Sequence, residues 1–143
     1  MKKVLAILIA AIALPAWSET DLAATAAKEK GAIVRPSGLV YLSLKEGSGA
    51  GPTAIDMVKV NYKGTLADGT QFDSSYDRGQ PAVFPLNRVI RCWTEGVQLM
   101  KPGGKARLTC PPSIAYGQAG AGGVIPPNAT LQFEIELLDV GRL

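Results

Sequence analysis

Alternation of apolar and polar residues constrains the fold of this chain more than any other feature of its sequence. Successive side chains of a strand point to opposite faces, so an alternation with a period of two predicts half-buried β-strands. The pattern appears only after Pro36, in segments that Gly- and Pro-containing stretches separate. These segments are 39–44, 57–66, 105–110 and 130–140. The larger part of the chain is therefore expected to form strands.

Two local sequence signals, a hairpin turn and a helix, allow the fold class to be predicted from these strands. Asp68 and Gly69 form the dipeptide expected of a tight hairpin, so segment 71–74 should return antiparallel to the strand before it. A helix is predicted over 93–100, where apolar residues are three or four positions apart. Those residues are Trp93, Val97 and Met100. The prediction is an α+β fold, in which a curved antiparallel β-sheet wraps around one short α-helix.

Residues 1–18 have the pattern of a signal peptide. A basic start precedes an unbroken apolar run over 4–14, and small residues follow at Ala16 and Ser18. The run is shorter than the ~20 apolar residues of a membrane-spanning helix, and it lacks the amphipathic pattern of a buried helix, so both alternatives are weaker. Export is therefore expected, to the periplasm or, if the source is not Gram-negative, to the medium. No stable membrane anchor is expected.

Residues 19–36 are predicted to be a short leader to the functional domain, 37–143. They are rich in Ala and Lys, and they show no apolar periodicity that would hold a face against a core. One or two helical turns are expected around 22–29. Because the leader is too short to form a dimerisation arm, we expect a monomer.

Composition excludes several kinds of function. The chain has no His, so it has no Ser-His-Asp or Cys-His nucleophile pair and no His-ligated zinc, and its two Cys cannot complete a four-thiolate site. No metal or other cofactor is expected. The net charge is +3, and removal of Lys2 and Lys3 with the signal peptide would lower it to +1. Such a balance gives no reason to expect a nucleic-acid partner.

A set of aromatic and aliphatic residues at strand ends and beside loops is the remaining distinctive feature. Its members are Tyr62, Phe72, Val89, Ile90, Trp93, Tyr116, Ile125 and Phe133. Each residue alone is more simply explained as core. Phe72 and Tyr116, however, stand in turn-rich sequence, which favours a binding surface.

The order of these residues resembles that of the FKBP-type peptidyl-prolyl cis-trans isomerases. The similar motifs are Val60-Asn61-Tyr62-Lys63-Gly64, Asp68-Gly69-Thr70-Gln71-Phe72-Asp73-Ser74-Ser75, Val89-Ile90-Arg91-Cys92-Trp93-Thr94-Glu95-Gly96, Ala115-Tyr116-Gly117, Ile125-Pro126-Pro127-Asn128-Ala129-Thr130-Leu131 and Phe133-Glu134-Ile135-Glu136-Leu137-Leu138. They run in order from about residue 37 to 140. The resemblance implies an enzyme that accelerates X-Pro isomerisation of unfolded exported polypeptides, with FK506-type macrolides as further ligands. The alternative is a non-catalytic chaperone module that binds prolyl segments in the same pocket.

The resemblance also implies a role for each site residue. It places Trp93 under the prolyl ring and Asp73 opposite the twisted amide, with Arg78 paired to Asp73. Tyr116 would donate its hydroxyl to a substrate carbonyl, and segment 118–124 would form a flap together with Ile125. The apolar walls would be Tyr62, Phe72, Val89, Ile90 and Phe133, and the Ile90 N–H would bind a second carbonyl. By this reading Tyr62, Phe72, Asp73 and Tyr116 are catalytic and the others bind substrate. Simpler roles stay open, a turn-capping acid for Asp73 and a solvated charge for Arg78.

The rim of the pocket and the two cysteines need separate comment. Ala82 stands where many family members have a Phe on the pocket rim, and Phe84 is expected to be a strand residue rather than its replacement, so a more open rim is predicted. Cys92 and Cys110 belong to a helix and a strand that pack together in the family fold. In an oxidising compartment they are expected to form a disulfide, with two buried free thiols as the alternative.

Overall fold

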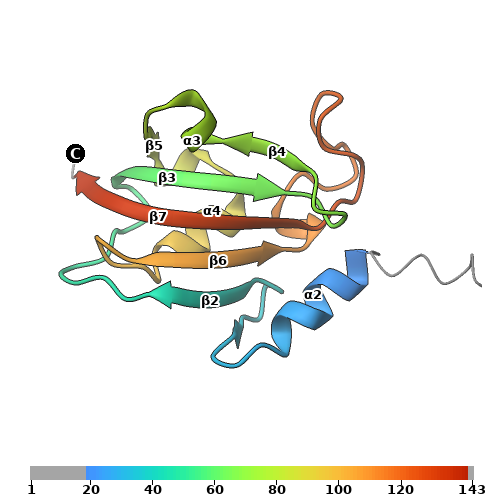
Figure 1. The fold of residues 1–143 in the computed structure, drawn as a ribbon, viewed down its shortest axis with the longest axis horizontal. Coiled ribbons are helices and arrows are strands. Elements are labelled where there is room, and N and C mark those ends of the chain that lie inside the picture. Colours follow the sequence, from blue (N-terminus) through green and yellow to red (C-terminus); the bar gives the residue numbers. More distant parts are fainter. Residues whose placement is uncertain (1–18, 142–143) are drawn as a thin grey trace, which may run out of the picture.

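The computed structural model describes residues 19–141, and an antiparallel sheet is its largest part (Figure 1). The hydrogen-bonded strand order is β1-β2-β6-β7-β3-β4, and β5 pairs with β3 beyond the end of β4. The strands are β1 Ile33–Val34, β2 Val40–Lys45, β3 Met57–Thr65, β4 Gln71–Ser74, β5 Ala82–Pro85, β6 Lys105–Cys110 and β7 Leu131–Gly141. The helices are α2 Glu19–Ala27, α3 Ser75–Arg78 and α4 Arg91–Val97, with the 3-10 helices η2 Leu86–Arg88 and η3 Pro112–Ile114.

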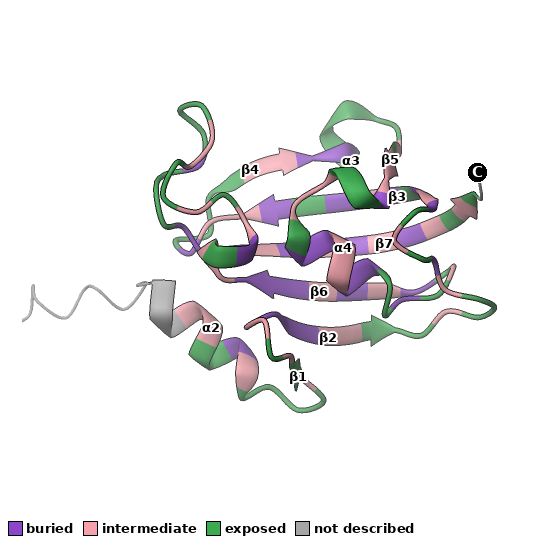
Figure 2. Cartoon of the chain, turned by 180° about the vertical axis from the view of Figure 1, so that it is seen from behind, coloured by how far each residue is buried: buried purple, intermediate pink, exposed green. Residues whose placement is uncertain are grey.

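The sheet packs its apolar face against α4, which crosses in front of β6 and β7 (Figure 2). On β3 the predicted alternation is confirmed, since Val58 and Val60 are buried while Lys59 and Lys63 are exposed. β7 alternates in the same way, and its buried positions are Leu131, Phe133, Ile135 and Leu137. The α+β architecture with a sheet around a short helix is therefore as predicted.

The hairpin between β3 and β4 also forms as predicted. Gly69 adopts a φ of 89°, which residues with a Cβ rarely adopt. The turn is closed by the Leu66 N–H, which donates to the Thr70 carbonyl at 2.8 Å. This return brings Asp73 opposite Gly64 in the register of the two strands.

Helix α4 is held tightly on β6. A Cβ on Gly96 would lie 2.3 Å from Leu108 Cδ2, so only glycine permits this approach. The structure joins Cys92 of α4 and Cys110 of β6 in the expected disulfide, and both residues are fully buried. The helix itself differs from the prediction, because it begins at Arg91 and its regular part ends at Val97. Beyond that residue the chain continues with 3-10-type hydrogen bonds, from the Leu99 N–H to the Gly96 carbonyl and from the Met100 N–H to the Val97 carbonyl.

Among the short elements whose bounds were not predicted, α3 and β5 lie beside the cavity. Helix α3 is a single turn that Ser74 caps, because its Oγ accepts the Asp77 N–H at 3.3 Å. The turn ends at Gly79, whose φ is 77°. Strand β5 follows and pairs antiparallel with β3, from Val60↔Ala82 to Met57↔Pro85. Together they form the edge of the sheet beside the cavity described below.

The segment before β2 contacts the sheet more closely than its sequence suggests. α2 packs against β6 and β2, with Ala26 only 4% exposed. Just beyond α2, the Glu29 Oε1 accepts from Arg107 Nη1 of β6 at 2.7 Å. The expectation that this segment has no face to hold against the core is therefore wrong for α2.

The predicted signal peptide, 1–18, lies outside the described residues. Within 19–141, no helix is both long enough and apolar enough to cross a membrane.

Candidate functional site

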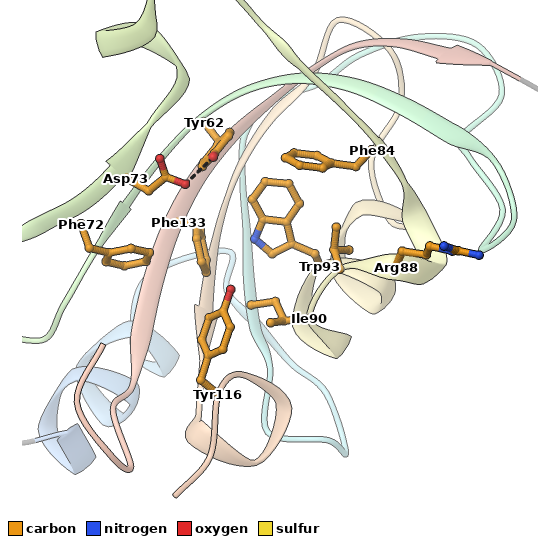
Figure 3. Close-up of a pocket in the computed structure, with 10 residues that line it drawn as sticks. Tyr62, Phe72, Asp73, Phe84, Arg88, Ile90, Trp93, Tyr116 and Phe133 are labelled. Atoms are coloured by element: carbon orange, nitrogen blue, oxygen red, sulfur yellow. Dashed lines mark hydrogen bonds between the residues drawn. The ribbon is translucent and has the colours of Figure 1, made fainter. Parts of the chain in front are cut away.

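A cavity of about 280 Å³ lies between the sheet, the start of α4 and the loop after η3 (Figure 3). Its size is close to the lower end of ordinary small-molecule sites, roughly 300 Å³. The lining is largely aromatic and aliphatic, with one carboxylate and one arginine. The lining residues are Tyr62, Phe72, Asp73, Phe84, Arg88, Val89, Ile90, Trp93, Tyr116 and Phe133.

Trp93 is at the centre of the aromatic cluster. It is 4% exposed, and its ring meets Tyr62, Phe84 and Phe133 edge-on. The ring centroids are 5.1, 5.7 and 5.4 Å away respectively, with interplanar angles of 84 to 88°. Such T-shaped contacts are favoured because a positive ring edge faces a negative ring face. Rings from β3, β5 and β7 therefore fix the indole as a rigid apolar surface.

The indole N–H adds a polar feature to this surface. Trp93 Nε1 is buried and has no hydrogen-bond partner among residues 19–141. Buried indole N–H groups usually find an acceptor. In Figure 3 this nitrogen faces the part of the cavity between Phe133 and Ile90.

Gly64 explains how Phe72 and Phe133 reach each other. A Cβ at this position of β3 would lie 2.6 Å from the Phe72 ring and 2.8 Å from the Phe133 ring. Without it the two rings meet edge-on above the strand, with centroids 5.6 Å apart. The glycine thus shapes one wall of the cavity without lining it.

A hydrogen-bonded group forms the polar edge of the cavity. The Tyr62 hydroxyl donates to Asp73 Oδ2, as Figure 3 shows, and Arg78 bonds to both residues. Arg78 Nη1 donates to Asp73 Oδ1 at 2.5 Å, and Nη2 donates to the Tyr62 hydroxyl at 2.9 Å. The guanidinium carbon is 5.6 Å from the centroid of the Tyr62 ring. Neighbouring strands and the single turn of α3 bring these groups together.

These contacts shift the pKa values of the group. Partial burial alone would raise the pKa of Asp73, but hydrogen bonds from Tyr62 and Arg78 outweigh it and hold that pKa below its usual value. Burial raises the pKa of Tyr62, and its bond to Asp73 acts in the same direction. The hydrogen bond to Tyr62, followed by the one to Asp73, raises the pKa of Arg78. At neutral pH the carboxylate is therefore charged and the phenol is a donor.

The opposite side of the cavity offers two further donors. Tyr116 lies in the loop after η3, is 41% exposed, and points its hydroxyl toward the cavity (Figure 3). Within the described part of the chain, that hydroxyl makes no hydrogen bond. Ile90 precedes α4, and its carbonyl accepts the main-chain N–H of Trp93 at 2.9 Å. The Ile90 N–H makes no hydrogen bond to another residue of 19–141, so this side of the cavity carries two donors that peptide carbonyls could meet.

The structure brings most of the predicted site residues together. Arg78 does not line the cavity but contacts it through Asp73 and Tyr62. Ile125 does not line it either: this residue is buried further along the same loop as Tyr116, where it bridges to Ala121. The remaining predicted residues all line the cavity, and their roles stay predictions.

Two lining residues were missed from the sequence, Phe84 and Arg88. Phe84 is a strand residue, as expected, and it also faces Trp93. Ala82, two positions earlier, does not line the cavity. Phe84 was expected in a strand, but its inward orientation depends on the pairing of β5 with β3, which the sequence did not predict. Arg88 is exposed, and in Figure 3 its guanidinium points away from Trp93.

Residues 19–141 contain no group of three or more Cys, Asp or Glu side chains that could hold a metal ion.

Comparison with known proteins gives consistent results. The profile of the FKBP-type peptidyl-prolyl cis-trans isomerase family matches residues 49–138. The chain is 57% identical over 124 residues to the FKBP-type peptidyl-prolyl cis-trans isomerase FkpA of Aeromonas hydrophila, covering 87% of this chain and 46% of that protein. It is 55% identical over 114 residues to FkpA of Escherichia coli K12, covering 80% and 42%. The chain thus spans less than half the length of these relatives.

Solved structures resemble the fold as well. The crystal structure of FkpA from Escherichia coli superposes with a TM-score of 0.84 at 50% identity, covering 87% of this chain and 58% of that one. A peptidyl-prolyl cis-trans isomerase from Pseudomonas syringae pv. tomato superposes with a TM-score of 0.81 at 37% identity, covering 99% and 98%.

Proposed function

The chain belongs to the FKBP-type peptidyl-prolyl cis-trans isomerase family, and on this premise we propose that its cavity accelerates rotation about X-Pro peptide bonds. The observation that supports this most directly is the buried Trp93 ring, which three aromatic rings hold at the cavity, while the Tyr116 hydroxyl points toward the same cavity. A prolyl ring fits such an apolar surface. The adjacent carbonyls can then meet the donors.

Rotation about an X-Pro bond is slow because the amide is resonance-stabilised. The barrier is ~18–20 kcal/mol, and the uncatalysed exchange takes tens to hundreds of seconds. Twisting the bond breaks the resonance and leaves a less polar amide. A dry apolar cavity binds that twisted state better than the solvated planar one, and such differential binding lowers the barrier without a covalent step.

Each polar group has a place in this scheme. Tyr116 and the Ile90 N–H bind the carbonyls on the two sides of the proline, which holds the peptide while the bond turns. Ionised Asp73 faces the twisted amide, and Arg78 keeps it charged. Tyr62, Phe72, Val89 and Phe133 exclude water as the walls. Ile125 supports the loop that covers the cavity.

The substrates are prolyl-containing segments of unfolded exported polypeptides, and the protein acts on them as a monomer in the periplasm. Two observations support export. Residues 1–18 have the pattern of a signal peptide. Cys92 and Cys110 form a disulfide, which persists in oxidising compartments.

FK506-type macrolides compete for the same cavity. Phe84 supports this, because it covers one side of Trp93 although Ala82 leaves the rim without its usual Phe. The rim is therefore less open than the sequence alone suggests.

A protease-coupled isomerisation assay on a Leu-Pro peptide tests the proposed activity. The rate constant of the slow cis-to-trans phase should rise in proportion to protein concentration, and an FK506-type macrolide should suppress the rise. The rival function is a non-catalytic module that only binds prolyl segments. It predicts an unchanged slow phase together with peptide binding, measured by NMR titration of the Trp93 indole resonance. That combination would overturn the enzyme proposal.

A further inference from the structure

Strand β3 changes its neighbour beside the cavity. On this edge β5 pairs with β3 as far as Val60, and β4 pairs with it from Lys63 onward. Asn61 and Tyr62 lie between the two ladders. The Tyr62 N–H consequently has no strand carbonyl to bind on this edge, and a main-chain donor in such a buried position needs an acceptor.

The side chain of Ser75 fills this gap. Ser75 is fully buried, and its Oγ accepts the Tyr62 N–H at 2.9 Å. The same hydroxyl donates to Asn61 Oδ1 at 2.8 Å. One side chain therefore replaces the missing ladder bond, and its hydroxyl is used both as donor and as acceptor.

Ser75 is also the first residue of α3, the single turn that carries Arg78. The Arg78 guanidinium reaches both Asp73 and Tyr62 from the last position of this turn. Helix α3 is also bonded to β4 at the surface, where Gln71 Nε2 donates to Asp77 Oδ2 at 2.7 Å. Ser75 thus supplies a buried link between the turn that holds the arginine and the strand that holds the phenol.

We propose that Ser75 is a positioning residue for the isomerase site. It fixes α3 against the backbone of Tyr62, which keeps Arg78 on Asp73 and on the phenol. Ser75 does not line the cavity, so it acts through Arg78 and not on the substrate. This role rests on the proposed function, because the group that it positions is the polar edge of the isomerase cavity.

The test is a double-mutant cycle between Ser75→Ala and Arg78→Leu in the peptide assay. Ser75→Ala should lower kcat/KM about tenfold when Arg78 is present and less than twofold when Arg78→Leu is already in place. Such non-additivity is expected when Ser75 acts through Arg78, because independent sites would lose rate additively. Ser75→Thr, which keeps the hydroxyl, should restore most of the rate.

Thr109→Val is the matched control. Thr109 is also a buried hydroxyl, 1% exposed, and it accepts from Gln132 Nε2 at 3.0 Å on β6, away from the cavity lining. This variant should leave kcat/KM within twofold of the wild type. If Ser75→Ala does not fold, Ser75→Cys takes its place, because it keeps the volume and weakens the acceptor.

Hydrogen exchange of the Tyr62 amide gives a readout independent of activity. Exchange should be at least tenfold faster in Ser75→Ala and unchanged in Thr109→Val. An active wild type whose Ser75→Ala variant loses rate equally with and without Arg78 overturns the positioning role, as does an unchanged Tyr62 amide. An inactive wild type overturns the proposed function instead, so the two failures are distinct.

Discussion

Tyr116 tests whether the cavity binds peptide carbonyls. Tyr116→Phe removes a hydroxyl that points toward the cavity, and one hydrogen bond is worth about 0.5–1.5 kcal/mol. We expect kcat/KM to fall about two- to tenfold in the peptide assay. The free energy of unfolding should hardly change, because the residue is 41% exposed. Tyr76→Phe is the control, since Tyr76 is 49% exposed on α3 and does not line the cavity. Equal rates for the two variants would contradict the assignment.

The lowered pKa of Asp73 predicts that this residue contributes to stability in a pH-dependent way. Its pKa is lower in the folded protein than in the unfolded chain, so its ionised form stabilises the fold above the ordinary Asp pKa of ~3.9. This contribution is lost as the pH falls through the lower, folded value. Because the side chains of Asp73 and Arg78 are 40% and 49% exposed, the contribution should be at most about 1 kcal/mol.

Urea unfolding of the wild type and Asp73→Asn measures this effect. The difference in unfolding free energy between the two proteins should be present at pH 7. It should shrink at a pH below the ordinary Asp pKa of ~3.9, where Asp73 begins to take up its proton. Asp139→Asn is a suitable control, because Asp139 is an exposed carboxylate near the end of β7. A difference for Asp73→Asn that is the same at both pH values would exclude the electrostatic explanation.

At this scale the sequence predicted residue types better than contacts. Tyr62, Phe72 and Trp93 were found because the order of aromatic residues resembles a known family. Phe84 was missed as a lining residue since its orientation depends on how β5 pairs with β3. Gly64 was part of a recognised motif, but its role depends on two rings that approach from other strands.

Among the elements, the link between α4 and β6 has the clearest effect on stability. The Cys92–Cys110 bridge closes a loop with a sequence separation of 18. On the chain-entropy account, closing a loop of this size contributes about 3 kcal/mol, because it restricts the unfolded chain. Reduction should lower the free energy of unfolding by this amount, measured by urea denaturation with and without reductant.

The double variant Cys92→Ala/Cys110→Ala separates the bridge from the reductant. It should lose at least as much stability as reduction does, and added reductant should have no further effect on it. A wild type whose unfolding midpoint is insensitive to reductant would show that the bridge contributes little.

The elements that the sequence predicted are those whose burial is one-sided over many residues. β3, β6 and β7 each have a buried and a more exposed face, so alternation identifies them. Helix α3 has only the four residues Ser75–Arg78, and tertiary bonds hold it more than its own propensity does. No periodicity can be recognised in so short a segment.

At the scale of the whole molecule, α2 extends the contact surface of the sheet. Ala26→Asp would place a charge at a position that is 4% exposed, and we expect a loss of about 1–3 kcal/mol in unfolding free energy. Ala24→Asp is the matched control, because Ala24 is exposed on the same helix and should cost less than about 0.5 kcal/mol. Similar losses, measured by urea denaturation, would show that α2 does not pack on the sheet in solution.

The packing of α2 could not be predicted from hydrophobic periodicity. Its contact is made by a small side chain, Ala26, and is completed by the Glu29–Arg107 ion pair across 78 residues of sequence. Neither feature gives an apolar stripe. The long strands around α4 could be predicted, because one antiparallel sheet with short connections leaves few arrangements for that helix.

The position of Trp93 has a practical consequence for spectroscopy. The chain has two tryptophans, Trp17 and Trp93, and the second is the base of the cavity. Trp17 lies in the expected signal peptide, so in a protein that begins at residue 19, or in a Trp17→Phe variant of the full chain, all indole emission would come from Trp93 in the cavity. Any ligand that displaces water from the indole should then shift that emission to shorter wavelength, so occupancy can be followed without a label and without turnover.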